Sequence, residues 1–353
     1  MTSSSDRGSL MSQGILKVAE RAKRDPDARF NSLAHLVDEA ALGRAYDRMR
    51  KDAAVGVDGI TKEQYGQHLE ENLRGLHERL KSMRYRHQPI RRVHIPKAKG
   101  KTRPIGISSV EDKIVQGALR EVLEVVYEQD FLECSYGFRH NRSAHDALRA
   151  VNQMASHEGI AVILEADIQA FFDSIDRKKL MEMLQIRVAD PPLLRLIGKC
   201  LHVGVLDGEQ FEKPDEGTAQ GSIISPMLGN VYLHYVLDLW FERVVRPRLR
   251  GEAYLVRYID DFVVCFQYRE DALRVQEALR KRLGKFGLTL EPSKTKLVEF
   301  GRFAQRHAPK RGRKRPETIY FLGFTLYCTR NQKGNFKVGL RTEKSRLQRS
   351  MSR

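Results

Sequence analysis

The stretch AYLVRYIDDFVVCF, residues 253–266, sets two adjacent acids between two runs of strand-forming residues. The gap between the runs is too short for anything but a tight turn, so the pattern predicts a β-hairpin with Asp260 and Asp261 at its tip. Two neighbouring carboxylates repel each other, and burying them is costly unless a divalent cation lies between them and a further acid.

That further acid follows another apolar run. Residues 161–166 (AVILEA) are typical of a buried strand, which leads directly into Asp167. Magnesium prefers oxygen ligands, and two such ions roughly 3.5–4 Å apart can stabilise the attacking and leaving oxygens of an in-line phosphoryl transfer. A lone Asp-Asp pair is more often an ordinary solvated turn, so the rest of the chain has to decide between the two interpretations.

Helical patterns dominate the first part of the chain, after a polar start (residues 1–12) that we expect to be disordered. Residues 90–107 predict a hairpin with a lysine-rich tip, KAKGKT. Ser108 with Glu111 predicts a capping box, and the apolar stripe that follows predicts a helix packed against its neighbours. A further helix is expected to begin after Asn141 or Ser143.

Beyond the Asp-Asp pair the pattern predicts a helix that stops at Gly287, followed by a strand from Leu288. The apolar residues that mark this helix are Leu273, Val275, Leu279, Leu283 and Phe286. Helices and strands are therefore segregated along the chain rather than strictly alternating, which favours an α+β fold.

The composition narrows the class of function. Of the 353 residues, 62 are Lys or Arg and 45 are Asp or Glu, a net charge of +17 that favours a polyanionic partner such as nucleic acid. The four cysteines are too far apart for a metal or redox pair, which argues against a disulfide-rich secreted protein. No apolar run is long enough for a signal peptide or a membrane span, so we expect a cytoplasmic location.

Seven sequence blocks, in order, resemble those of reverse transcriptases, and the bacterial group II intron type in particular. They are IPKAKGKTRPIGI (95–107), SYGFRHNRSAHDAL (135–148), ADIQAFFDSI (166–175), GTAQGSIISPMLGNVYL (217–233), YIDDFVV (258–264), GLTLEPSKTKLVEFG (287–301) and FLGF (321–324). One block alone would be weak evidence, whereas seven in this order, spanning about residues 45 to 340, are specific.

The resemblance implies an RNA-directed DNA polymerase with a right-hand fold, in which an α+β palm carries the YIDD hairpin beside helix-rich fingers. The expected parts are an N-terminal extension (1–44), fingers (45–160), a palm (161–340) with a nucleotide-binding loop (217–226) and a primer-grip region (317–328), and the start of a thumb helix (341–353).

The resemblance also assigns the chemistry. Asp167, Asp260 and Asp261 would be the catalytic residues that hold two magnesium ions, for which manganese can substitute, and the Ile168 carbonyl would add a ligand. These ions would be the cofactor of the reaction.

The residues just after Asp167 have separate expected roles. Phe172 matches the family's steric gate, an aromatic ring that leaves no room for a 2′-hydroxyl, although Phe171 and Phe172 could equally be core residues, as at least one is expected to be. Asp173 and Asp176 are interpreted as helix-start or surface carboxylates, with Asp176 suited to an N-cap.

Further residues match the family's contacts to the incoming nucleotide. They are Arg103 with Lys97 (or Lys99 or Lys101) at the triphosphate, Gln220 and Gly221 in the nucleotide-binding loop, and Lys294 near the triphosphate or primer end. A planar guanidinium suits phosphate oxygens, whereas any single lysine could be merely solvated.

Primer and template contacts are expected at Arg139, Tyr258, Leu322 and Gly323, the last two within the primer grip. The basic segment 302–315 would contact phosphates without sequence preference or would be a solvated loop.

Two departures from the family leave alternatives open. The chain ends with LRTEKSRLQRSMSR, only the first turns of a thumb helix, so the thumb and maturase parts are expected to be lost or supplied separately. His140 and Asn141 stand where many relatives carry Pro-Gly.

The first hypothesis is RNA-templated DNA synthesis, with an RNA template, a DNA primer and dNTPs as partners and no membrane. The alternative is a catalytically weak RNA-binding or splicing-cofactor protein that keeps the fold and binds intron RNA. RNA-templated RNA synthesis is disfavoured by the aromatic residue at position 172 and by the YIDD context.

Overall fold

The computed structural model describes residues 12–96, 102–156, 159–213, 216–218, 221–309 and 312–343. These residues divide into two compact units, each built from two stretches of chain. The first unit is Met1–Phe131 with Phe172–Tyr232, and the second is Leu132–Phe171 with Leu233–Arg353.

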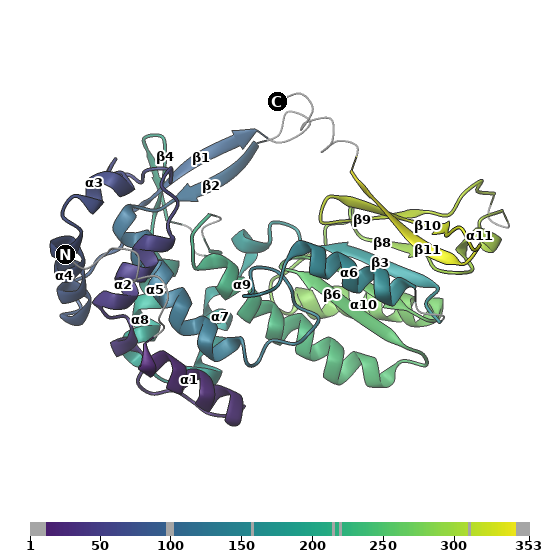
Figure 1. Ribbon diagram of the computed structural model, residues 1–353, viewed down its shortest axis with the longest axis horizontal. Helices are drawn as coiled ribbons and strands as arrows, with labels where there is room; N and C mark the ends of the chain where they lie inside the picture. Colours follow the sequence, from purple (N-terminus) through teal and green to yellow (C-terminus); the bar gives the residue numbers. More distant parts are fainter. Residues whose placement is uncertain are drawn as a thin grey trace. The chain divides into compact units, whose positions relative to one another are not determined.

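The first unit is mainly helical, and its longest helix, α5 (Val110–Tyr127), is largely buried and contacts α1 and α2 (Figure 1). The other helices of this unit are α1 (Gln13–Arg24), η1 (Ala34–Leu36), α2 (Glu39–Arg48), α3 (Lys62–Gly66), α4 (Leu69–Lys81), α7 (Arg177–Arg187) and α8 (Pro191–Leu201). Two short elements straddle the unit boundaries, η3 (Phe171–Ser174) and α9 (Ser225–Leu233).

The cap of α5 differs from the sequence prediction by one residue. The N-cap is Ser109, whose hydroxyl accepts from the Asp112 amide at 3.3 Å, and not Ser108. Ser108 instead accepts a hydrogen bond from the Gln116 side chain, and Glu111 binds Arg79. Both serines have an acid three residues later, so the local pattern fits either one as the N-cap. The packing around them decides which serine caps the helix.

The predicted hairpin of residues 90–107 is present in the first unit. β1 (Ile90–Pro96) and β2 (Thr102–Ile107) pair antiparallel, with Ile95 opposite Arg103. The hairpin extends into a small sheet of order β2-β1-β4-β5 through β4 (Val205–Asp207) and β5 (Gln210–Glu212).

The second unit is built on an antiparallel sheet of order β6-β7-β3-β8. Its strands are β3 (Val162–Asp167), β6 (Ala253–Tyr258), β7 (Asp261–Phe266) and β8 (Lys296–Glu299). A second antiparallel sheet of order β11-β10-β9 contains β9 (Thr318–Phe321), β10 (Phe324–Arg330) and β11 (Phe336–Thr342). With the antiparallel sheets and many helices, the predicted α+β class is confirmed.

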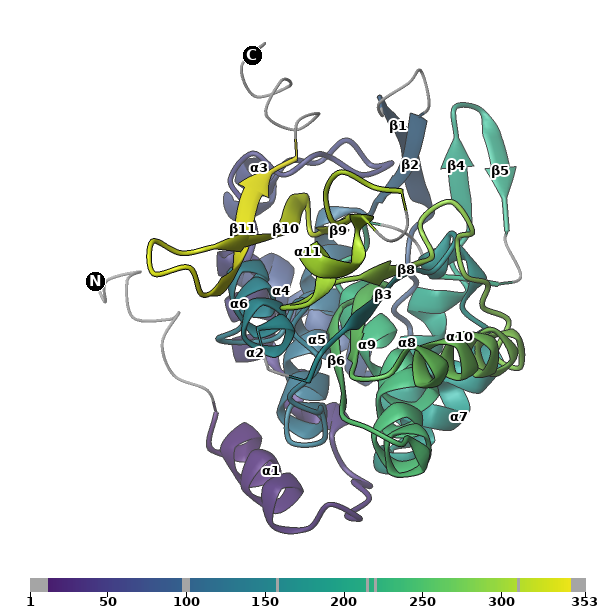
Figure 2. The ribbon, with the colours of Figure 1, turned by 90° about the vertical axis from the view of Figure 1, so that its right-hand side faces the viewer.

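The second unit also contains several helices. They are α6 (Ala144–Ala155), α10 (Arg269–Gly284), α11 (Ala304–His307) and the short helices η4 (His234–Asp238), η5 (Phe241–Val245) and η6 (Arg246–Arg248). Figure 2 shows α6 and α10 on opposite sides of β3 and β6. The helix predicted after Asn141 or Ser143 is α6, which has Ser143 as its N-cap in a capping box with Asp146.

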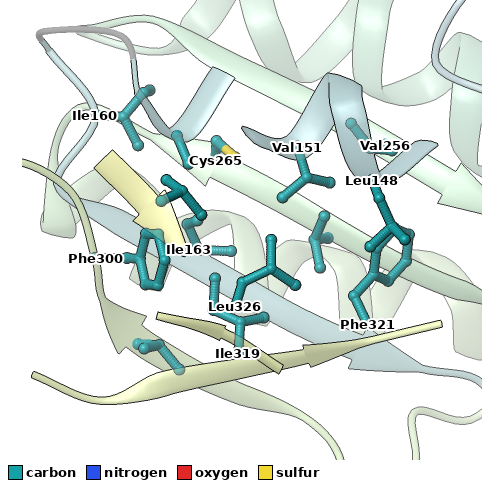
Figure 3. Close-up of a cluster of buried hydrophobic side chains, with 14 of the residues drawn as sticks. Leu148, Val151, Ile160, Ile163, Val256, Cys265, Phe300, Ile319, Phe321 and Leu326 are labelled. Atoms are coloured by element: carbon teal, nitrogen blue, oxygen red, sulfur yellow. The ribbon is translucent and has the colours of Figure 1, made fainter. Parts of the chain in front are cut away.

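Apolar side chains join these layers into one core (Figure 3). Ile163 and Val256 of the larger sheet pack with Val151 of α6 and with Ile319 and Leu326 of the smaller sheet. Because β3 is buried from Val162 to Ala166 on both faces, its sequence is a mostly apolar run, interrupted by Glu165, rather than an alternation.

Two sequence predictions in the second unit are wrong in detail. Leu273 of α10 is 48% exposed and does not belong to the buried stripe. No strand begins at Leu288: after Gly287, with φ of 75°, the chain makes one isolated bridge between Leu290 and Ile168 and then turns at Glu291–Lys294. Pro292 lies in this turn and has no amide to donate to a ladder, so the strand begins only with β8.

No helix among the described residues is long and apolar enough to cross a membrane. The expected location in the cytoplasm stays a prediction.

Replacing Ile163 by Ala should lower the free energy of unfolding by about 2–5 kcal/mol, because it leaves a cavity at the centre of the core. Urea unfolding measures the change. Leu273→Ala, on the exposed face of α10, should change stability by less than about 0.5 kcal/mol, and an equal loss in both variants would contradict the proposed core.

Candidate active site

The turn between β6 and β7 is strained. Tyr258 pairs with Asp261 across the hairpin, which leaves Ile259 and Asp260 at the tip. Ile259 has φ of 56° and is buried, a rare combination for a β-branched residue. A positive φ at the first tip residue alone is typical of type II′ hairpin turns, where glycine is usual. The surroundings must therefore hold this turn in place.

The register of the sheet brings the three predicted catalytic acids together at one end of the central strands β3 and β7. Asp167, the last residue of β3, lies directly opposite Asp261, the first residue of β7. The amide of Ile168 donates to the carbonyl oxygen of Asp260 at 3.3 Å, which ties the end of β3 to the hairpin tip. Ile168 itself is buried.

Asp261, one of the three acids, has a clearly shifted pKa. Burial raises its pKa to about 7, the Leu322 amide opposes the rise by donating to Oδ2 at 3.3 Å, and the charges of Asp167 and Asp260 add to it. A carboxyl in this environment is stabilised in its charged form by a nearby cation.

The cation that the structure supplies is Lys294. The turn that carries it is fixed to β3, because the Glu291 amide donates to the Asp167 carbonyl at 2.8 Å and the Lys294 amide donates to the Glu291 carbonyl. The Lys294 ammonium forms an ion pair with the Asp167 carboxylate. Partial burial lowers the pKa of Lys294, but the hydrogen bond to Asp167 and the charges of Asp261 and Asp260 outweigh it and raise the pKa.

Within the described ranges, no three His, Cys, Asp or Glu side chains are gathered as a formed metal-binding cluster. The acids at the end of β3 and β7 nevertheless suit a hard divalent cation: all the side-chain donors are carboxylate oxygens, and their mutual repulsion is unfavourable without positive charge. The fit to magnesium rests on this donor chemistry.

Glycine at position 137 allows the chain to approach the hairpin tip. A Cβ there would lie 2.8 Å from both the backbone nitrogen and Cγ1 of Ile259. The preceding residues run along β6, where the Tyr136 amide donates to the Arg257 carbonyl at 2.9 Å. The ring of Tyr258 lies 6.3 Å from that of Phe138.

Of the predicted primer and template residues, Leu322 and Gly323 form the turn between β9 and β10, with φ of 52° and 80°. Two successive positive φ values are typical of a type I′ hairpin turn. This turn adjoins the acids through the Leu322 amide. Arg139 is mostly buried and donates to the carbonyl oxygens of Leu132 and Ser135 at 2.7 and 2.9 Å.

Of the residues predicted to bind the nucleotide, Arg103, Phe172 and Gly221 belong to the first unit, whereas Lys294 belongs to the second. Thr218, in the predicted nucleotide-binding loop, donates its amide to the Phe172 carbonyl at 2.6 Å. Gly221, with φ of 106°, comes so close to β2 that a Cβ would lie 2.6 Å from the Gly106 carbonyl oxygen. Arg103 is an exposed residue of β2. Lys97, Lys99, Lys101 and Gln220 lie outside the described residues.

The neighbours of Phe172 agree with their predicted structural roles. Phe171 is a buried core residue, and Asp176 caps α7 by accepting from the Lys179 amide at 3.0 Å. Asp173 is an exposed residue of η3, but neighbouring atoms partly desolvate its carboxyl, which raises its pKa against the opposing charges of Arg92 and Arg103.

Sequence reasoning missed a buried pair, Arg257 and Asp238, behind the β6–β7 turn. The sequence does contain one clue to this pair, a single arginine within the largely apolar run YLVRYI. A charge at such a position requires a buried partner, but the sequence does not name it.

Comparison with known proteins gives consistent matches. Residues 95–326 match the family described as "Reverse transcriptase (RNA-dependent DNA polymerase)". Protein YkfC of Escherichia coli (strain K12) is 30% identical, over 93% of this chain and 91% of that protein. Group II intron-encoded protein LtrA of Lactococcus lactis subsp. cremoris is 36% identical over 67% of this chain and 40% of its own length. An uncharacterised 91 kDa protein in the cob intron of Schizosaccharomyces pombe is 37% identical over 67% of this chain and 30% of its own length.

Gly137→Ala should lower the free energy of unfolding by about 1–3 kcal/mol, because the added methyl displaces the backbone of the hairpin tip. Chemical denaturation measures it. The matched control is Gly75→Ala in α4, where nothing lies within 4 Å of the added Cβ and a gain of about 0.5–1 kcal/mol is expected. A stabilised Gly137→Ala protein would refute the close approach.

Proposed function

The chain belongs to the reverse transcriptase family of RNA-directed DNA polymerases, of the group II intron type, and we propose that it extends a primer 3′ end with dNTPs by two-metal-ion phosphoryl transfer. The observation that carries the proposal is the pairing of Asp167 with Asp261 at the end of β3 and β7, with Asp260 in the adjoining turn.

In this proposal Asp167, Asp260 and Asp261 hold the ions through carboxylate oxygens, and the Ile168 carbonyl adds a ligand. Bound magnesium, or manganese in its place, would activate the primer 3′-hydroxyl and neutralise charge on the phosphates. The strained hairpin and the register of β3 and β7 fix the positions of the acids before substrate arrives, which lowers the reorganisation required during the reaction.

The remaining residues would bind and select the nucleotide. Arg103, with Lys97, would hold the triphosphate. Gln220 would lie near the sugar, and Gly221 would permit close approach of the backbone to the nucleotide. Lys294 is paired with the Asp167 carboxylate in the structure. When the nucleotide binds, its ammonium would bind the triphosphate instead. Phe172 would exclude a 2′-hydroxyl.

The nucleic acid would be bound by Leu322 and Gly323 at the primer end and by Tyr258 and Arg139 on the primer or the template. The family uses an RNA template and a primer, and the net charge of +17 favours phosphate contacts along both. Because LtrA is named as group II intron-encoded, we further propose that the natural template is a group II intron RNA.

Asp260→Asn should reduce primer extension on an annealed RNA template by about a hundredfold or more, because it removes a charged metal ligand. Single-turnover dNTP addition with magnesium measures the rate. Asp52→Asn, at an exposed ion pair with Arg50, should leave the rate unchanged.

Equal extension by the Asp260→Asn variant would refute the metal assignment. A wild-type protein that binds primer-template tightly yet adds no dNTP would support the alternative, an RNA-binding protein that keeps the polymerase fold.

Phe172→Ala should lower the preference for dNTPs over NTPs by about tenfold or more, because the space beside the sugar is no longer filled. The ratio of kcat/KM for the two nucleotide sets measures this preference. Phe211→Ala, at an exposed aromatic residue of β5, should leave the ratio as in the wild type. An unchanged ratio in Phe172→Ala would contradict the gate.

A further inference from the structure

A fully buried ion pair lies directly behind the catalytic turn. Arg257 of β6 binds Asp238, at the end of η4, through two parallel hydrogen bonds: Nε to Oδ1 at 2.7 Å and Nη2 to Oδ2 at 2.6 Å. Both side chains are 0% exposed. The planar guanidinium and the carboxylate therefore meet in the bidentate geometry that fixes orientation as well as distance.

The same guanidinium reaches two other segments. Its Nη2 donates to the Ser135 hydroxyl at 2.8 Å, and its Nη1 donates to the Ile259 carbonyl at 3.3 Å. The backbone of Arg257 is fixed as well, because its amide donates to the Cys134 carbonyl at 2.8 Å. One side chain thus joins η4, the segment around Ser135 and the tip of the β6–β7 hairpin.

The backbone is unusual on both sides of the Arg257 side chain. Asp238 ends a π-helical turn, a rare widened conformation that is frequent at functional sites. On the other side, Ile259 is held at a positive φ that its branched side chain disfavours. The carbonyl that Arg257 binds belongs to the peptide linking Ile259 to Asp260, so the hydrogen bond restrains the orientation of that peptide.

A buried ion pair is weak evidence for a stabilising role, because well-packed apolar residues often serve stability equally well. Arg257 makes a contact that apolar residues could not make, since only a donor can bind the Ile259 carbonyl. Lysine could keep the charge, but its single ammonium lacks the planar fork that reaches Asp238, Ser135 and Ile259 together.

We propose that Arg257 is a positioning residue for nucleotide addition: anchored by Asp238 and Ser135, it holds the Ile259–Asp260 peptide in the orientation that presents the Asp260 carboxylate. This inference rests on the proposed function. Arg257 acts through Asp260 and touches neither substrate nor metal.

The test uses the full chain with two altered forms. Arg257→Lys keeps a buried charge opposite Asp238 but loses the fork. The double variant Arg257→Met with Asp238→Leu removes both charges, so that no unpaired charge remains buried. The control is Arg44→Lys in the first unit, where Arg44 and Glu121 form another buried ion pair: Nε and Nη2 of Arg44 both donate to Oε1, and Arg48 binds Oε2 of the same carboxylate.

The Tm of each protein is measured first. Four quantities are then measured well below it: kcat and KM for dNTP addition, the Kd for primer-template, and amide hydrogen exchange in the segment 258–262. In Arg257→Lys we expect kcat to fall at least about tenfold, as for a small misplacement of a catalytic group, while KM and Kd change by less than about threefold. Exchange in 258–262 should quicken. The double variant should regain the wild-type Tm but not the wild-type kcat.

Three outcomes would overturn the inference: a kcat for Arg257→Lys as high as that of Arg44→Lys, a double variant with wild-type kcat, or unchanged exchange in 258–262. Should Arg257→Lys fail to fold, the double variant decides alone. A wild-type protein that adds no nucleotide refutes the proposed function instead, and the exchange measurement still reports whether Arg257 holds the turn.

Discussion

Asp167 and Asp261 are held opposite each other at the ends of two buried strands, with Asp260 in the adjoining turn, so their mutual repulsion has to be offset locally. The structure meets this constraint with groups from separate parts of the chain. The Leu322 amide donates to Asp261, the Lys294 ammonium binds Asp167, and the buried Arg257 guanidinium lies behind the turn. Each of these groups also fixes its own segment of the chain beside the acids. The contacts that offset the repulsion therefore also hold the site together.

The rigidity of this arrangement comes from burial on both faces of β3. One face packs on α6 and the smaller sheet, and α10 contacts the same strand. Both layers are apolar, so a one-residue shift would not expose β3 to water, but it would exchange the side chains that pack on the two layers, including the buried Glu165. The register that sets Asp167 against Asp261 is therefore fixed by Ile163, Val263 and Cys265, which carry no chemistry themselves.

The sequence was sufficient to predict the elements that depend on local pattern: β3, the β6–β7 hairpin, the β1–β2 hairpin and α6. It was also sufficient to mark the three acids, because buried strands that end in carboxylates are unusual. The sequence alone could not predict contacts between side chains or backbone groups that lie far apart along the chain. Nothing local shows that Arg257 meets Asp238, or that the Leu322 amide serves Asp261. The cap of α5 was misplaced because Ser108 and Ser109 have the same local pattern, and the strand expected from Leu288 gave way to the turn that contains Pro292.

The discontinuity of the second unit has a consequence for synthesis on the ribosome. Val162–Asp167 emerges with the first stretch of this unit, but its ladder partners β7 and β8 emerge only after the intervening stretch of the first unit has been made. Until then an apolar strand has two unpaired edges, the condition that favours misassociation of nascent chains. The first unit is likewise interrupted, by 132–171, so neither unit can close before the chain has passed residue 232. Folding of the sheet that carries Asp167, Asp260 and Asp261 is therefore a late event in synthesis.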